Sequence, residues 1–167
     1  MKSRTVYRDL LNTPWGWVGA LWTEGGLRRM VLPRKRKSDV VKILEKGGGA
    51  AAVERRWNEW RKQVAAYLAG RRRCFDLPLD LQEDGEFTEA VRAVVEAIPY
   101  GETMTYGEVA AAAGRPRAAR AVGNVMNRNP VPLLVPCHRV VAVSGRGGFA
   151  SGPELKGKLL DLEAKGG

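Results

Sequence analysis

The chain has 167 residues, enough for one domain or for two small lobes that share an interface. Its 44% hydrophobic content excludes a mostly disordered protein, and no apolar run approaches the roughly 18 residues needed to cross a bilayer. Lysine and arginine outnumber aspartate and glutamate by 28 to 18, and the net charge of +10 favours polyanionic partners such as nucleic acids.

Residues 1–11 carry scattered charges and no apolar stretch of the kind that a signal peptide needs, so we expect a cytoplasmic protein. Its two cysteines, Cys74 and Cys137, are too far apart for a disulfide framework or a zinc-binding spacing. The chain has a single histidine, His138, and therefore too few soft ligands for a metal site. We expect no metal, no other cofactor and no membrane association.

Residues 1–80 predict a small α/β lobe that ends in a linker. Residues 15–23 and 27–32 are strand-like runs, and Glu24-Gly25-Gly26 between them suits a hairpin turn. The basic run at 34–37 is more typical of a solvated loop than of a binding site.

Three glycines at 47–49 interrupt the chain before an amphipathic helix. The apolar positions of this helix are Trp57, Trp60, Val64 and Leu68. An aromatic stripe of this kind fits a helix packed against a core better than it fits a platform for stacking bases. The helix ends at Arg71-Arg72-Arg73, and residues 77–81 are typical of a linker.

Residues 81–167 are richer in predicted helix. The first helix stops before Pro99, and its apolar face consists of Phe87, Val91, Val94, Val95 and Ile98. Thr105 and Glu108 match a capping box at the start of a short helix that runs to about Ala113.

A second helix follows the turn Gly114-Arg115-Pro116 and runs from about Arg117 to Asn127, which makes a helix-turn-helix candidate. Its apolar stripe consists of Ala118, Ala121, Val122 and Val125. A neighbouring face carries Arg117, Arg120, Asn124 and Arg128, and small residues keep the surface low at Ala119 and Gly123.

A helix with so few base-reading side chains is unlike one that reads the major groove. Its small, cationic surface suits contact with the minor groove and little sequence discrimination. An arginine-rich face that contacts only solvent is the simpler alternative.

Pro136-Cys137-His138-Arg139-Val140 places a potential nucleophile beside the chain's one histidine. A thiol with the ordinary pKa of about 8.5 is only a few per cent thiolate at neutral pH, so a reactive cysteine needs a group that stabilises the anion. In extended backbone, adjacent side chains point to opposite sides, which favours a bridging water over a direct bond between the two residues. A small buried cysteine with an incidental histidine is the alternative.

The last predicted helix starts near Pro153 and buries Leu155, Leu159 and Leu162, with Glu163 at the edge of that stripe. A carboxylate half inside a core needs a partner. His138 and Arg139 are the candidates, and a solvated C-terminal carboxylate is the alternative.

Together these segments resemble the O6-alkylguanine-DNA alkyltransferase family. The matching stretches, which cover most of residues 85–165, are 98–109, 118–123, 129–132, 135–141, and 147–152 leading to Lys156 and 159–163. The Pro-Cys-His-Arg-Val core with the Arg-Ala-Val-Gly helix is highly specific. Over the first 80 residues the resemblance rests on layout.

The resemblance implies a ribonuclease H-like α/β lobe at residues 1–80. It also implies a mainly α domain at 81–167 that contains the helix-turn-helix and the active-site cysteine. The implied catalytic residues are Cys137, His138, Glu163 and Tyr106, the first three linked through a water. The implied DNA-binding residues are Tyr106, Arg117, Ala119, Arg120, Ala121, Gly123 and Asn124. The implied alkyl and base pocket consists of Pro132, Val140, Phe149 and Ser151, with structural support from Asn129 and Arg139.

The family's activity implies a single-turnover repair protein that rotates O6-alkylguanine out of the duplex and transfers the alkyl group to its own Cys137. In the family, an arginine at the position of Arg120 fills the vacated space, and a tyrosine at the position of Tyr106 assists the rotation and protonates the guanine. The expected partner is double-stranded DNA carrying O6-alkylguanine, bound through its minor groove by a monomer. In the cell the protein would be cytoplasmic, and nucleoid-associated when on DNA.

Three other classes of protein are compatible with parts of the pattern. A non-catalytic protein that binds alkylated lesions would lack the acceptor at position 137. A helix-turn-helix regulator would need more base-reading groups on its second helix. A cysteine hydrolase would need an oxyanion hole and water access to an acyl-enzyme. The fate of Cys137 distinguishes them.

Overall fold

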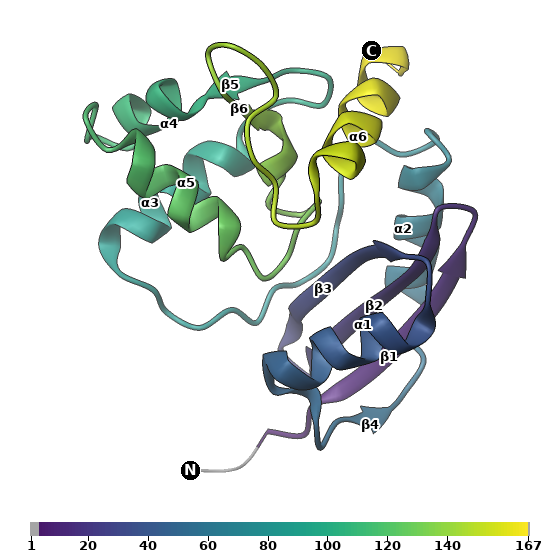
Figure 1. Ribbon diagram of the computed structural model, residues 1–167. Helices are drawn as coiled ribbons and strands as arrows, with labels where there is room; N and C mark the ends of the chain where they lie inside the picture. Colours follow the sequence, from purple (N-terminus) through teal and green to yellow (C-terminus); the bar gives the residue numbers. More distant parts are fainter. Residues whose placement is uncertain (1–3, 167) are drawn as a thin grey trace. The chain divides into compact units, whose positions relative to one another are not determined.

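The computed structural model describes residues 4–166, and the chain divides into two compact units, one ending at Gln82 and the other beginning at Glu83 (Figure 1). The elements of the first unit are β1 (Tyr7–Thr13), β2 (Gly16–Thr23), β3 (Gly26–Arg34), α1 (Lys37–Leu44), the glycine-rich turn Glu45–Gly49, β4 (Val53–Glu54) and α2 (Asn58–Leu68).

The four strands form one mixed sheet in the order β3-β2-β1-β4. β1 pairs antiparallel with β2, and β2 pairs antiparallel with β3 through the predicted hairpin, where Thr23 lies opposite Gly26. The short edge strand β4 pairs parallel to β1. Strand β1 was not predicted, because charged and polar residues such as Asp9 break its apolar alternation.

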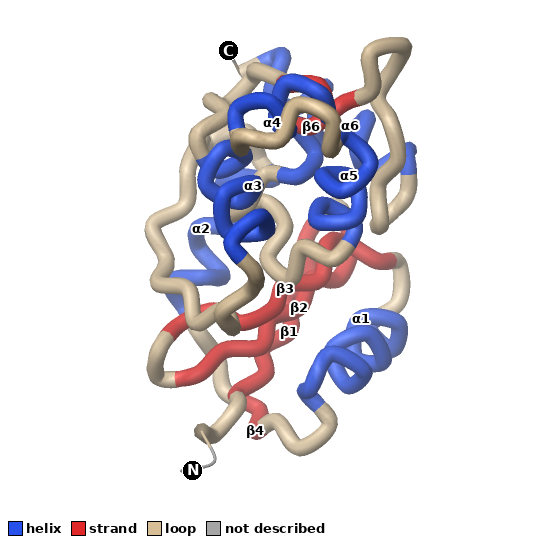
Figure 2. The backbone as a smooth tube through the Cα atoms, turned by 90° about the vertical axis from the view of Figure 1, so that its left-hand side faces the viewer, coloured by secondary structure: helices blue, strands red, loops and turns tan. Residues whose placement is uncertain are grey.

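The central strand β2 is buried on both faces, since α1 and α2 cover opposite sides of the sheet (Figure 1, Figure 2). On one face Leu21 packs with Val31 of β3 and with Val40 and Leu44 of α1. On the other face Trp22 stacks on Trp57, with ring centroids 5.0 Å apart.

The predicted aromatic helix is present as α2, with Trp57 as its N-cap residue and Trp60, Val64 and Leu68 buried as expected. The basic run is only in part a loop, because Arg34 ends β3 and Lys37 begins α1. Helix α1 was missed because its apolar stripe is short and begins inside that run of charges.

The predicted linker at residues 77–81 is hydrogen-bonded to the first unit. Leu27 of β3 donates its N–H to Pro78 O (2.8 Å) and accepts from Asp80 N (2.9 Å). The side chain of Gln63 in α2 bonds both the N–H and the C=O of Asp76. Two independent backbone attachments therefore hold this segment in place.

The second unit is mainly helical. Its elements are α3 (Glu86–Glu96), β5 (Met104–Thr105), α4 (Tyr106–Ala112), α5 (Ala119–Asn127), the 3₁₀ turn Cys137–Arg139, β6 (Val140–Val141) and α6 (Pro153–Lys165). Helices α3, α4 and α5 pack together, and β5 pairs parallel with β6, which ties the start of α4 to the strand that follows Cys137 (Figure 1).

The predicted capping box is present at the start of α4. Thr105 Oγ1 accepts the N–H of Glu108 (3.1 Å), and the Glu108 carboxylate accepts the N–H of Thr105 (2.7 Å). Hydrogen bonds from Thr105 lower the pKa of Glu108. These bonds set the orientation of Tyr106, the first residue of the helix.

The second helix of the pair begins later than predicted. Ala118 N bonds Arg115 O (2.9 Å), which closes a turn, and Ala118 is the N-cap of α5. Arg117 therefore lies in the turn and not on the helix. Across residues 4–166 the structure contains no helix long and apolar enough to span a membrane.

Candidate active site

Cys137 follows a tightly specified loop. Asn129 donates its side-chain N–H to Val135 O (2.8 Å) and accepts the N–H of Val131 (3.1 Å), so one amide closes the loop from both ends. Within the loop Leu133 is buried with a φ of 74°, a conformation that non-glycine residues rarely adopt. Asn129 therefore fixes the conformation of the loop that precedes Cys137.

The backbone at Cys137 differs from the extended form assumed from sequence. Cys137–Arg139 is a 3₁₀ turn, because Pro136 O accepts the N–H of Arg139 at 2.9 Å. A 3₁₀ helix has three residues per turn, so the side chains of Cys137 and His138 still diverge. Their divergence comes from the turn and not from strand alternation.

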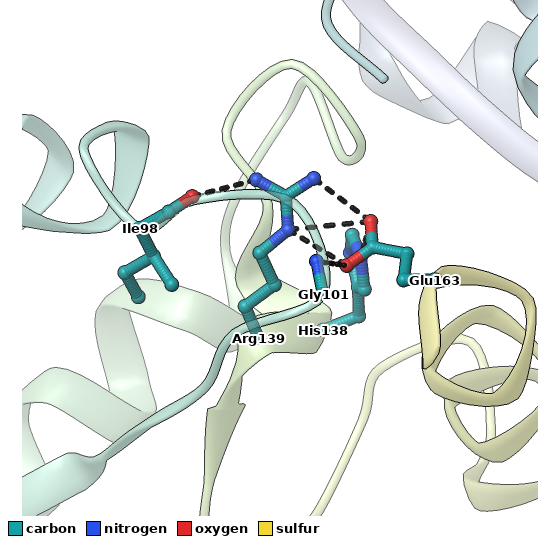
Figure 3. Close-up of polar contacts among 5 residues, drawn as sticks. All are labelled: Ile98, Gly101, His138, Arg139 and Glu163. Atoms are coloured by element: carbon teal, nitrogen blue, oxygen red, sulfur yellow. Dashed lines mark hydrogen bonds and ion pairs between the residues drawn. The ribbon is translucent and has the colours of Figure 1, made fainter. Parts of the chain in front are cut away.

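His138 and Arg139 both point to Glu163 of α6 (Figure 3). His138 Nε2 lies 2.8 Å from Glu163 Oε1, and Arg139 reaches both carboxylate oxygens, with Nη2 2.8 Å from Oε1 and Nε 2.9 Å from Oε2. Gly101 N donates to Oε2 (3.2 Å), and Arg139 Nη1 donates to Ile98 O (2.7 Å). All three side chains are buried, so both predicted partners of the carboxylate are engaged.

This arrangement assigns the tautomer of His138. An ionised carboxylate that faces an arginine can only accept hydrogen bonds, so the neutral imidazole carries its proton on Nε2. Nδ1 is then the acceptor of the ring. Burial lowers the pKa of His138, and the Glu163 carboxylate opposes that effect.

The thiol of Cys137 is buried, and burial raises its pKa. The side chain of Asn129, the charge of Lys156 and the backbone N–H groups of Cys137 and His138 act in the opposite direction. Burial is the largest of these effects, so the resting protein holds the thiol in its protonated form.

Lys156 of α6 is completely buried, although the motif did not mark it as a site residue. Its Nζ donates to Val140 O (2.6 Å) and Gly148 O (3.0 Å). The predicted leucine stripe of α6 is rotated, since the buried positions are Lys156, Gly157, Leu159 and Glu163. The spacing of Lys156, Leu159 and Glu163 at i, i+3 and i+7 is the signal that could have found this face.

Tyr106 contacts the loop that precedes α6. Tyr106 OH donates to Gly148 O (3.2 Å), and burial raises its pKa. Pro132 and Val140 are buried, whereas Phe149 and Ser151 are only partly covered.

The polar residues of α5 form an exposed face. Arg120, Asn124 and Arg128 are exposed, as is Arg117 before the helix, while Ala119, Ala121 and Gly123 are partly covered. The buried side of α5 consists of Val122 and Met126. Within the described residues, no group of three or more His, Cys, Asp or Glu side chains could hold a metal ion.

The second unit therefore combines a buried thiol, a histidine oriented by a carboxylate and a cationic helix face, which defines a class of protein that uses a cysteine for covalent chemistry. The family model described as the DNA-binding domain of 6-O-methylguanine DNA methyltransferase matches residues 86–165. A methylated-DNA–protein-cysteine methyltransferase of Methanosarcina acetivorans is 38% identical over 159 residues, which cover 95% of this chain and 98% of the relative. This chain belongs to the methylated-DNA–protein-cysteine methyltransferase family.

Solved structures of similar proteins match this chain over both of its units. The crystal structure of Mycobacterium tuberculosis O6-methylguanine methyltransferase has a TM-score of 0.82 and 31% identity, covering 98% of this chain and 95% of that chain. The Mycobacterium tuberculosis protein in complex with DNA has a TM-score of 0.81 and 32% identity, covering 96% and 94%. The mixed sheet and the six helices of residues 4–166 match this fold.

Proposed function

We propose that this protein repairs O6-alkylguanine in double-stranded DNA by transferring the alkyl group to its own Cys137. The observation that carries the proposal is the buried thiol beside the His138–Glu163–Arg139 cluster in a chain of this family. A thiol in this setting has both a proton acceptor nearby and groups that stabilise its anion.

The transfer is a displacement at carbon. The Cys137 thiolate attacks the alkyl carbon, the S–C bond forms as the C–O bond breaks, and the electron pair of the broken bond stays on guanine O6. The thiol proton passes through a water to His138 Nδ1, and Glu163 stabilises the resulting imidazolium. Tyr106 donates a proton toward guanine N3, which makes the base a better leaving group.

The product is a thioether, whose sulfur is a poor leaving group, and the chain has no evident means to hydrolyse it. Each molecule therefore acts once. The alkyl group and base lie in a pocket lined by Pro132, Val140, Phe149 and Ser151.

Helices α4 and α5 act as a helix-turn-helix that binds the minor groove. The low surface at Ala119, Ala121 and Gly123 lets the backbone of α5 approach the groove, and Arg117 and Asn124 contact the DNA beside it. The alkyl carbon is inaccessible in stacked DNA, so the nucleotide rotates out at a cost of a few kcal/mol, and Arg120 fills the gap.

We assign DNA binding and alkyl acceptance to residues 81–167 and a supporting role to the lobe at 1–80. The sheet order β3-β2-β1-β4, with β4 parallel to β1, supports a ribonuclease H-like arrangement of that lobe. The protein acts as a monomer in the cytoplasm, on the nucleoid when bound to DNA.

Intact mass measurement tests the proposal. After incubation with excess duplex carrying one O6-methylguanine, the protein should gain a single methyl group, and peptide mapping should locate it on Cys137. Cys137→Ala, and wild type given undamaged duplex, should gain none. Binding without a mass gain would indicate a non-catalytic lesion-binding protein, and many repaired guanines per protein would exclude a single-use acceptor.

A further inference from the structure

Arg115 lies in the turn between α4 and α5, and its backbone is fixed from both sides. Gly114 follows α4 with a φ of 84°, the left-handed conformation that favours glycine, and Arg115 N then donates to Ala110 O (2.9 Å). Arg115 O accepts from Ala118 N (2.9 Å), the N-cap residue of α5. Pro116 disfavours a helical conformation at Arg115. The backbone of this arginine is therefore held in one place.

The side chain of Arg115 is held by a third helix, α3. Its guanidinium Cζ lies over the ring of Phe87, 5.0 Å from the ring centroid. Phe87 is partly buried in the first turn of α3, whereas Arg115 is exposed. An aromatic ring attracts a cation but carries no net charge and is not a partner for its N–H donors. The contact therefore orients the guanidinium and leaves its charge and its donors available.

The charge of Arg115 is not neutralised by the protein. Across residues 4–166 no carboxylate forms an ion pair with Arg115, and Glu89, in the first turn of α3, is engaged by Arg92 instead (2.9 Å). By contrast, Arg128 at the end of α5 is held within its own helix, where its Nε donates to Asn124 O (3.3 Å). Arg115 is thus an exposed cation that a neighbouring helix orients and that has no counter-charge in the described part of the chain.

We propose that Arg115 binds a phosphate of the DNA backbone, and that Phe87 is the positioning residue that holds its guanidinium ready for this contact. The inference rests on the proposed function, which assigns α4 and α5 to the DNA interface. Arg117, two residues further along the same turn, already belongs to that interface. A phosphodiester fits the site because its negative charge and its paired oxygens match the paired N–H donors of a guanidinium.

The charge of Arg115 and the ring of Phe87 should affect binding in different ways. The charge determines how strongly affinity depends on salt, because each neutralised phosphate releases counterions. The ring limits the rotational freedom that the arginine side chain would otherwise lose on binding, so it affects affinity at every salt concentration. These two effects can be measured separately.

The affinity for an undamaged duplex, measured by fluorescence anisotropy over a range of salt concentrations, tests the phosphate contact. Arg115→Gln should reduce the slope of log affinity against log salt by about one in magnitude. Lys165→Gln is the matched control, because it removes one exposed charge from the C-terminal end of α6, and it should keep the wild-type slope. A wild-type slope in Arg115→Gln would overturn the proposal.

Phe87→Leu tests the orienting ring. It should keep the slope and weaken binding about two- to fivefold, since the charge remains and only the ring contact is lost. Phe87→Tyr keeps an aromatic ring and should bind like wild type. In an Arg115→Gln background, Phe87→Leu should cost no further affinity, because no guanidinium is left to orient. An equal loss in both backgrounds would show that Phe87 does not act through Arg115, against the proposal.

NMR can follow the ring contact in the unaltered protein. The ring current of Phe87 should shift the side-chain protons of Arg115 upfield, and this shift should persist when duplex is added. Its loss on binding would contradict the proposal, whether or not Phe87→Leu folds. Methyl transfer to Cys137 is measured separately. Absence of transfer together with the expected slopes would refute the proposed repair reaction and leave the phosphate contact standing.

Discussion

At the scale of single residues, Glu163 is a buried carboxylate that needs several hydrogen-bond partners to offset its loss of hydration. Its buried carboxylate accepts three hydrogen bonds from Arg139 and one from Gly101 N, and lies against His138 Nε2. Breaking a buried ion pair from one side leaves the other charge unpaired. Glu163 therefore supports the fold at the same time as it orients His138.

Glu163→Gln should lower the free energy of unfolding by about 3–5 kcal/mol, because it leaves the buried Arg139 without a counter-charge. Urea denaturation measures this. Asp161→Asn is the control from the same helix, because Asp161 pairs with Arg146 at the surface and should contribute about 0–1 kcal/mol. Equal stability of the two variants would contradict the structural role of Glu163.

His138 should make stability depend on pH. Its pKa is lowered in the folded state by burial, so the unfolded chain binds a proton more readily and stability rises with pH in this window. The stabilisation is present above the ordinary pKa of about 6.5 and is lost as pH falls below it. Melting temperatures at pH 7.5 and 5.5 should differ in wild type.

His138→Gln provides the comparison, because glutamine keeps an N–H donor for Glu163 but does not titrate. The difference in melting temperature between the two pH values should shrink in this variant. If the melting temperatures at the two pH values differ as much in His138→Gln as in wild type, a group other than His138 causes the pH dependence.

At the scale of elements, the loop at residues 141–148 is attached to α6 through Arg146. Its guanidinium lies over Gly157 and pairs with Asp161 Oδ1 at 3.1 Å. Both charged side chains are more than half exposed, so the pair itself is weak. Gly157, in the middle of a helix, is explained by the space that Arg146 needs above it.

Gly157→Ala should therefore stabilise helix α6 and at the same time displace Arg146 and the loop that carries it. Alanine favours the helix by up to about 1 kcal/mol, and its Cβ would overlap the flexible end of Arg146. We expect a more stable protein with a looser loop, seen as faster transfer from O6-benzylguanine relative to O6-methylguanine. Arg146→Ala should raise that ratio without the gain in stability, and an unchanged ratio in both variants would show that Arg146 does not restrain the pocket.

The same elements show what the sequence could predict. Capping residues and helical periodicity located α2, α3, α4 and α6 because those signals are local. The late start of α5 depends on the turn that Arg115 closes, and the rotated face of α6 depends on the carbonyls that satisfy Lys156. Motif positions indicated Cys137, His138 and Glu163 as candidates. The burial of Lys156 depends on its two carbonyl partners, and the spacing of Lys156, Leu159 and Glu163 was its one local signal.

At the scale of the whole molecule, the positive charge is unevenly divided along the chain. Residues 1–82 contain 18 lysines and arginines against 8 acidic residues, and residues 83–167 contain 10 of each. Residues 86–165, which match the DNA-binding family model, contain 10 basic and 8 acidic residues, a net charge of only +2. We therefore expect the affinity of this part for DNA to come from a few arginines, with the surplus charge of the first unit acting at longer range.

The salt dependence of DNA binding should reflect the placed arginines. If about four cations neutralise phosphates, log affinity falls against log salt with a slope of roughly −3 to −4. Arg128→Ala removes an exposed charge at the end of α5 and should reduce the magnitude of the slope by about one. Arg120→Ala should leave the slope nearly unchanged and slow methyl transfer, because Arg120 is proposed to fill the gap in the base stack. A reduced slope in Arg120→Ala and slower methyl transfer in Arg128→Ala would instead assign phosphate binding to Arg120 and filling of the gap to Arg128.

The surplus charge of the first unit should govern how fast DNA is captured. Lys35, Lys42 and Lys46 lie exposed on and beside α1. Replacing all three with glutamine should lower the association rate at low salt, and the difference from wild type should vanish as salt screens the field. The rate of methyl transfer in preformed complexes should not change, because none of these residues belongs to the proposed site. Stopped-flow association and single-turnover transfer separate the two steps, and a slower transfer step would mean that the first unit takes part in the chemistry as well as in the capture of DNA.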